Sequence, residues 1–88
     1  MNKEQERLRM GERIATLRKE KGMTQQDLAD VTGLLRNHIS RIEQGRYSVG
    51  FDTLQAIAEA LGMTVDIIDE RLADLTPMKT LTSTADVR

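Results

Sequence analysis

Four hydrogen-bonding side chains recur at helical spacing near the middle of the chain: Arg36, Asn37, Ser40 and Arg41. At about 100° per residue, they fall within an arc of about 140° on one side of a helix. Arginine can donate two hydrogen bonds to guanine, and asparagine can pair with adenine, so this strip suits the recognition of DNA base edges. An ordinary solvated face is the alternative, but such a face usually mixes acidic with basic side chains, and this strip has no carboxylate.

The elements around the strip predict how it is held. Leu35, Ile39 and Ile42 lie on the opposite side of the same helix and are expected to be buried. A shorter helix precedes it, with Thr24 as N-cap and an acidic residue three positions later, an arrangement that satisfies free amide groups. The connection is glycine followed by a leucine that we expect in the core. Two helices over about residues 25–32 and 35–44, joined this closely, predict a helix-turn-helix whose second helix enters the DNA major groove.

The rest of the chain also favours helices. Apolar residues recur every three or four positions over residues 4–21 and again over residues 51–61, and a fifth helix is predicted from Thr64 to Thr76–Pro77. The expected inward-facing residues of the last two are Phe51, Leu54, Ile57, Ala58, Leu61, Val65, Ile68 and Leu72. The predicted fold is therefore an all-α, five-helix bundle.

One small domain is expected in 88 residues. We assign the domain to residues 10–76. Residues 1–9 form an N-terminal extension of the first helix, and whether they are helical or frayed is left open. Residues 77–88 are polar and unpatterned, which is typical of a flexible tail.

Composition excludes several kinds of chemistry. The chain has no cysteine and one histidine, His38, so neither a disulfide nor a histidine–cysteine metal site is expected. His38 is predicted to be a half-buried packing residue. No motif for catalysis or for holding a cofactor is found, and no second domain could hold a small molecule, so we expect no enzyme activity and no cofactor. The absence of a long apolar run and the charged N-terminus predict a soluble cytoplasmic protein without a membrane contact.

Charge is distributed unevenly. Residues 1–46 contain ten Lys or Arg and seven Asp or Glu, a net charge of +3, whereas residues 47–88 contain three and seven, a net charge of −4. Such asymmetry is a modest indication of a polyanion partner for the first half of the chain.

These residues together resemble a known family, the phage-repressor and Cro-like (XRE-type) helix-turn-helix regulators of bacteria. The resemblance runs over about residues 11–68, and its motifs are "TQQDLA", "ISRIEQG" and "LQAIAEALG" at the family's spacing, with Arg18 and Gly33 in their expected places. It implies a five-helix bundle that binds double-stranded DNA.

Carried over by position, the resemblance implies base contacts from Arg36, Asn37, Ser40 and Arg41. It implies phosphate contacts from Gln25, Gln44 and Arg46, and a structural salt bridge between Arg18 and Glu43. For Gln25 the physics agrees, because a helix N-terminus offers amide groups to a phosphate.

Two positions depart from the family's pattern. Leu35 stands where a Ser or Thr often caps the recognition helix, which costs about 1 kcal/mol of stability unless another group compensates; an aliphatic side chain there can meet a thymine methyl. Gly50 occupies the corresponding position of the fourth helix, where glycine is tolerated.

The family resemblance also implies partners. Operators read by two-fold proteins are inverted repeats, so a homodimer is expected, with Ile67 and Leu75 as candidate interface residues. The favoured function is a transcriptional regulator, most simply a repressor that occupies its operator. The alternative is a protein-interaction module, such as the antitoxin of a toxin–antitoxin pair, in which DNA binding is secondary.

Overall fold

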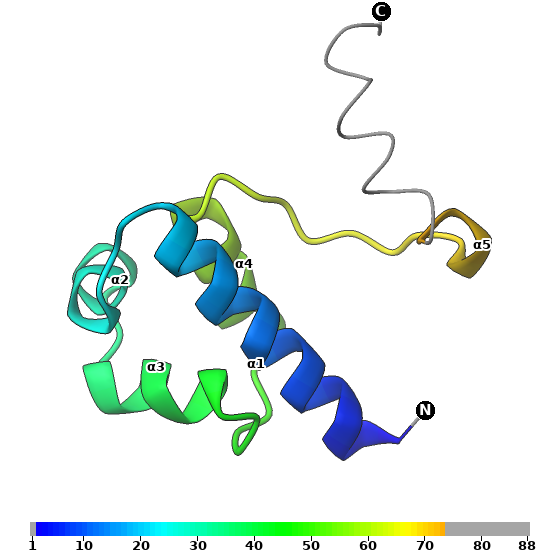
Figure 1. Cartoon of the computed structure of the whole chain (residues 1–88), viewed down its shortest axis with the longest axis horizontal. Coiled ribbons are helices and arrows are strands. Elements are labelled where there is room, and N and C mark those ends of the chain that lie inside the picture. The colour runs from blue at the N-terminus through cyan, green and yellow to red at the C-terminus, as the bar shows by residue number, and fades with distance from the viewer. Residues whose placement is uncertain (1, 74–88) are drawn as a thin grey trace, which may run out of the picture.

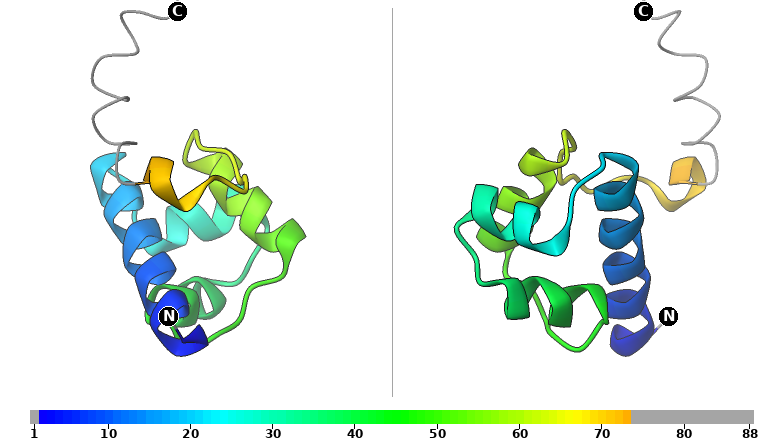
Figure 2. Two further views of the ribbon diagram at one scale, coloured as in Figure 1. Left: turned by 90° about the vertical axis from the view of Figure 1, so that its right-hand side faces the viewer. Right: turned by 60° about the vertical axis from the view of Figure 1, so that its left-hand side comes forward.

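The computed structural model describes residues 2–73, which contain helices and no β-strand (Figure 1). The helices are α1 (Lys3–Glu20), α2 (Gln25–Thr32), α3 (Arg36–Glu43), α4 (Phe51–Ala60) and the single turn α5 (Glu70–Ala73). The all-helical class is confirmed, and α1 to α4 lie within one or two residues of their predicted bounds. Figure 2 shows α1 along one side, with α3 crossing near its N-terminal end and α2 near its C-terminal end.

An aliphatic core joins α1 to α4. Its fully buried large side chains are Leu28, Ile39, Ile57 and Leu61, each no more than 1% exposed, and Ile14, Leu17 and Ile42 extend it. Each of the first four helices supplies at least one of these residues. The apolar face predicted for each helix is therefore the face that is buried in the core.

The first helix includes the N-terminal residues whose conformation the sequence left open. Asn2 caps α1 by accepting a hydrogen bond from the amide of Gln5, at 2.7 Å, so residues 3–9 are helical. Gly11 then allows α1 to approach α3 very closely: a β-carbon at this position would lie 2.6 Å from the carbonyl oxygen of Glu43 and would also collide with that of Ile42. The N-terminal half of α1 is thereby fixed against the C-terminal end of α3.

The turn between α2 and α3 occupies residues 33–35. Gly33 has φ 77° and ψ 13°, a left-handed conformation that glycine adopts without steric cost, and its amide donates to the carbonyl of Ala29. Leu34 is half-buried and packs on the core, as predicted. At the other end of α2, Thr24 and Asp27 exchange hydrogen bonds of 2.9 Å between side chain and backbone, which is the predicted capping box.

Two apolar residues that are predicted to be buried stand at helix starts and are exposed. Leu35 is 77% exposed and Phe51 is 62% exposed. Both stand at helix starts: Leu35 is the N-cap of α3 with extended backbone, and Phe51 is the first residue of α4. The helical angle used for the prediction does not apply to an N-cap, because its backbone is not yet helical.

The prediction that a fifth helix starts at Thr64 is wrong. Residues 63–69 have no regular secondary structure, and α5 is one turn that begins at Glu70. The side chain of Asp66 accepts a hydrogen bond from the amide of Ile67, and that of Asp69 from the amide of Arg71. The bond at Asp66 competes with helix formation, whereas the bond at Asp69 is of the kind that caps a helix start and precedes α5. The β-branched residues nearby disfavour a helix as well. The described residues therefore hold four full helices, and a five-helix bundle is not confirmed.

The end of the predicted fifth helix at Pro77, the tail over residues 77–88 and the interface residue Leu75 lie outside the described residues.

Candidate nucleic-acid interface

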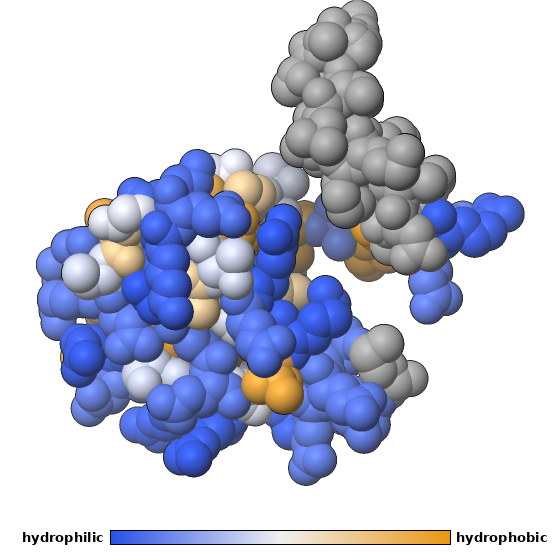
Figure 3. Space-filling view, in the orientation of Figure 1, coloured by the Kyte–Doolittle hydropathy of each residue, from blue (hydrophilic) through white to orange (hydrophobic). Residues whose placement is uncertain are grey.

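The outer face of α3 presents the strip that the sequence predicts. Arg36, Asn37 and Arg41 are exposed and Ser40 is half-buried. On the inner face Ile39 and Ile42 are 1% and 2% exposed, so burial of these two isoleucines fixes which side of α3 points outward. The lower edge of the molecule in Figure 3, where α3 runs in Figure 1, is predominantly hydrophilic.

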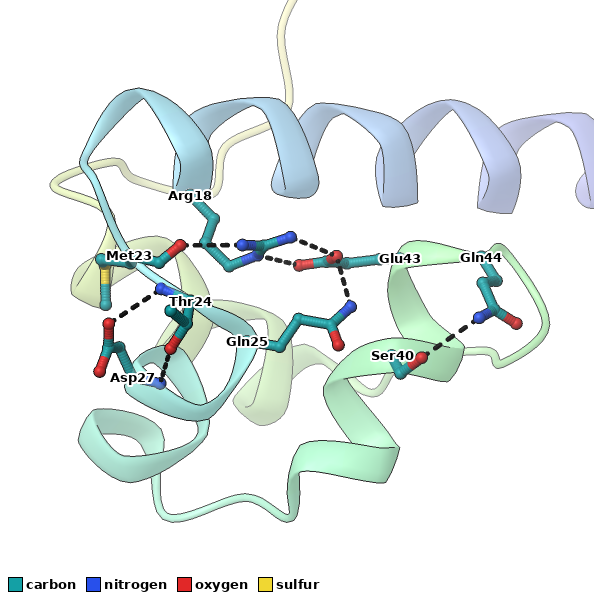
Figure 4. Close-up of polar contacts among 8 residues, drawn as sticks. All are labelled: Arg18, Met23, Thr24, Gln25, Asp27, Ser40, Glu43 and Gln44. Carbon is teal, nitrogen blue, oxygen red and sulfur yellow. Dashed lines mark hydrogen bonds and ion pairs between the residues drawn. The ribbon is translucent and has the colours of Figure 1, made fainter.

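The single acidic residue of α3 lies inside. Glu43 is 9% exposed and forms a two-point ion pair with Arg18 of α1, Nε to Oε2 at 2.6 Å and Nη2 to Oε1 at 3.0 Å (Figure 4). Hydrogen bonds to this carboxylate raise the pKa of Arg18 above its usual value, against the opposing effect of burial. The pair that the resemblance implied is thus present, and the outer face of α3 keeps two arginines with no carboxylate beside them on the helix.

Gln25 has a contact that the sequence did not predict. Its Nε2 donates to Oε1 of Glu43 at 3.0 Å, so the first residue of α2 joins the Arg18–Glu43 pair (Figure 4). Arg18 also donates to the backbone carbonyl of Met23 at 2.8 Å, just before the start of α2. This network ties α1, α2 and α3 together at the point where the start of α2 reaches the surface.

The remaining candidate phosphate contacts follow the strip. Gln44 is exposed, and its Nε2 donates to Oγ of Ser40 at 3.2 Å. Arg46 is exposed in the loop after α3, where its backbone amide donates to the carbonyl of Arg41. Both residues therefore lie at the C-terminal end of the exposed strip.

His38 occupies the edge of α3 between the two faces. It is half-buried and packs edge-on against Tyr47, with ring centroids 4.5 Å apart. Its Nε2 is buried and has no hydrogen-bond partner among residues 2–73. These contacts fit the predicted packing role.

Ile67 is 96% exposed on the segment between α4 and α5. A groove of about 550 Å³ lies beside this segment, between α1 and α4, and Ile68, Val65 and Met63 contribute apolar surface to it. These residues do not close the core of the described chain, contrary to the prediction for Val65 and Ile68.

The described part of the chain contains neither a candidate metal site nor a candidate membrane-spanning helix. Residues 2–73 contain no group of three or more His, Cys, Asp or Glu side chains that could hold a metal ion. None of the helices described is both long enough and apolar enough to span a membrane.

Two structural roles were missed at the sequence level. Gly11 makes the close crossing of α1 and α3, and a glycine inside an otherwise helical pattern was the available signal. The bond from Gln25 to Glu43 joins residues 18 positions apart, and no local pattern predicts it.

This geometry defines a helix-turn-helix: two short helices, a left-handed glycine turn, and a second helix with a buried aliphatic side and an exposed polar side. A family model described as helix-turn-helix matches residues 14–68. The chain belongs to this family of XRE-type helix-turn-helix proteins.

Similar sequences and similar solved structures also belong to regulators and related proteins. The chain is 42% identical over 59 residues to the immunity repressor protein of Bacillus phage phi105, covering 67% of this chain and 41% of the repressor. It is 36% identical over 62 residues to antitoxin PezA of Streptococcus pneumoniae, covering 69% and 39%. The crystal structure of the restriction-modification controller protein C.AhdI from Aeromonas hydrophila matches with a TM-score of 0.65 and 31% identity, over 66% of this chain and 88% of that one. The chain thus spans less than half the length of the two relatives.

Proposed function

We propose that the protein binds double-stranded DNA in a sequence-specific manner and regulates transcription, as a repressor that occupies its operator. The outer face of α3 carries this proposal, because it exposes Arg36, Asn37 and Arg41 without a neighbouring carboxylate on a helix set as in helix-turn-helix proteins. The similarity to a phage immunity repressor and to other transcriptional regulators supports it. We assign no enzyme activity or cofactor, and a regulator of this kind meets its DNA in the cytoplasm.

The side chains divide into two groups. Arg36, Asn37, Ser40 and Arg41 contact base edges, and Gln25, Gln44 and Arg46 contact phosphates on either side. For Gln25, one N–H of the amide is bonded to Glu43. The second N–H is the one that donates to a phosphate, beside the free backbone amides at the start of α2.

A titration tests the proposal. Fluorescence anisotropy is measured with the duplex upstream of the protein's own gene and with a scrambled duplex of equal length, each at two salt concentrations. We expect binding to the native duplex to be tighter by about a thousandfold or more. Equal, weak and strongly salt-dependent binding to both duplexes would reduce the interaction to phosphate attraction and would contradict sequence-specific regulation.

The active form is proposed to be a homodimer on an inverted repeat. The support is the apolar surface around Ile67, which is 96% exposed and lies next to the groove between α1 and α4. Leu75 is proposed as a second interface residue. Sedimentation velocity compares the wild-type protein with Ile67→Glu, and the proposal requires the variant to dissociate at a concentration at which the wild type is dimeric.

A second candidate function follows from the similarity to antitoxin PezA. In this function the chain binds a toxin partner and DNA binding is secondary. A small toxin-like gene next to its own, whose product copurifies with this chain when the two are expressed together, would favour it.

A further inference from the structure

A second groove, of about 200 Å³, lies between the first turns of α1 and the loop that follows α3. Four residues with side-chain hydrogen-bond donors line it: Arg7 and Arg9 from α1, and Tyr47 and Ser48 from the loop. Glu6 lines it as well, with apolar surface from Met10, Ile42, Val49 and Leu54. We call it the α1–loop groove. None of the strip residues on α3 lines this groove, and none of the three candidate phosphate contacts does.

Backbone packing places the groove at the end of the recognition helix. Gly11 is buried against the last carbonyl groups of α3, and Leu8 lies against Gly45, where an added β-carbon would be 2.8 Å from the Cα of Leu8. In both views of Figure 2, the N-terminal end of α1 lies beside the loop after α3. The groove therefore lies next to Arg46, the proposed phosphate contact.

The groove has a surplus of positive charge. Glu6 is engaged by Arg9, with an Nη2–Oε1 distance of 3.0 Å. Arg7 forms no ion pair within residues 2–73. It lies four residues before Gly11 and so on the same side of α1, the side turned to α3. Arg7 is thus a half-buried residue that lines the groove together with Tyr47 and Ser48, and its charge is not paired within residues 2–73.

We infer that the α1–loop groove binds a DNA backbone phosphate, with Arg7 as the charged donor and the hydroxyl groups of Tyr47 and Ser48 beside it. This inference rests on the proposed function, and it extends the DNA interface to a residue outside the segment 14–68 that matches the family model. An arginine with two hydroxyl donors suits a phosphate oxygen and carries no base preference. Arg7 therefore strengthens binding to every DNA sequence alike.

The salt dependence of binding tests the groove directly. Each phosphate contact contributes about 0.9 to the slope of log K against log salt. Arg7→Gln should therefore lower that slope by about 0.9 and weaken binding about tenfold at 0.1 M salt, equally for operator and scrambled duplexes. Arg7→Lys should retain most of the slope. The matched control is Arg13→Gln, which removes the same charge from the side of α1 that faces α4 and should leave the slope unchanged.

Ethylation of single phosphates locates the contact. We expect ethylation of one phosphate per half-site to weaken DNA binding by the wild-type protein but not by Arg7→Gln. This phosphate should lie next to the one whose ethylation no longer matters in Arg46→Ala. The inference is overturned if Arg7→Gln, folded as judged by thermal denaturation, has the wild-type slope, or if Arg13→Gln lowers the slope as much. Either result would overturn the groove inference alone, because the wild-type protein would still prefer the operator to the scrambled duplex. If the wild-type protein itself bound both duplexes equally, the proposed function would be overturned.

Discussion

Arg18 and Glu43 form a buried ion pair that joins α1 to α3, with side chains only 9% and 6% exposed. Two parallel hydrogen bonds hold it, and Glu43 accepts a third from Gln25. Removing one partner of such a pair leaves an uncompensated buried charge, which costs far more than the pair itself contributes.

We therefore expect Arg18→Met to reduce the free energy of unfolding by about 3–5 kcal/mol, measured by urea denaturation. The double variant Arg18→Met/Glu43→Leu removes both charges and should recover most of the loss. If the double variant were as unstable as the single one, the cost would come from lost packing and not from the orphaned carboxylate.

Gly11 should not tolerate a side chain. Alanine favours a helix interior by about 1 kcal/mol over glycine, but at this position its β-carbon would collide with the carbonyl oxygens of Ile42 and Glu43. Because backbone has to move, Gly11→Ala should lower stability by about 1–3 kcal/mol. Glu12→Ala, at an exposed neighbouring position, is the control for thermal denaturation, and equal melting temperatures for the two variants would contradict the close crossing.

The start of α3 is an opportunity for stabilisation. Leu35 provides no side-chain hydrogen bond as N-cap, whereas Thr24 caps α2. Leu35→Ser should therefore raise the free energy of unfolding by about 1 kcal/mol, and Thr24→Ala should lower it by a similar amount. Equilibrium unfolding of both variants beside the wild type checks the opposite signs, and a destabilised Leu35→Ser would mean that the leucine packs more than its exposure suggests.

The sequence predicted α1 to α4 well because two independent signals agree there. In α2, for example, the apolar spacing around Leu28 coincides with the capping box of Thr24 and with the glycine stop. The burial of Ile39 and Ile42 followed from the same periodicity, which is why the exposed side of α3 could be identified without coordinates.

The failures have physical causes. Leu35 is an N-cap, where the helical angle does not fix the direction of a side chain, and Phe51 is exposed at the first position of α4. After Thr64 the spacing is helical, but the amide of Ile67 donates to the side chain of Asp66, a local bond that competes with helix formation. A helix begins only after Asp69, which accepts from the amide of Arg71. The bond between Gln25 and Glu43 depends on how α2 and α3 are placed in space, and local patterns carry no such information.

Acid should weaken the start of α2. Hydrogen bonds from the backbone amide and then the side chain of Thr24 hold the pKa of Asp27 below its usual value. Because the folded-state pKa is the lower one, the carboxylate's contribution to stability is complete above about pH 4 and is lost as pH falls through the folded-state value. Asp27→Asn keeps an acceptor but cannot titrate. Below about pH 4 the melting temperature of the wild type should therefore fall relative to that of the variant. A constant difference between the two from pH 7 to pH 2 would contradict this role.

Arg41 and Arg46 should differ in what they do to DNA recognition. Arg41 is exposed within the strip on α3, so Arg41→Ala should cost about 1–3 kcal/mol on the operator and relax the preference at one base pair. Arg46 lies in the loop beyond the helix, so Arg46→Ala should weaken binding to all sequences and reduce the salt slope by about 1. The two variants are compared by anisotropy on the operator, on single base-pair changes of it and on a scrambled duplex, at several salt concentrations. If both lost affinity equally on every duplex, α3 would be held near DNA by charge alone, and the separation of base contacts from phosphate contacts would be wrong.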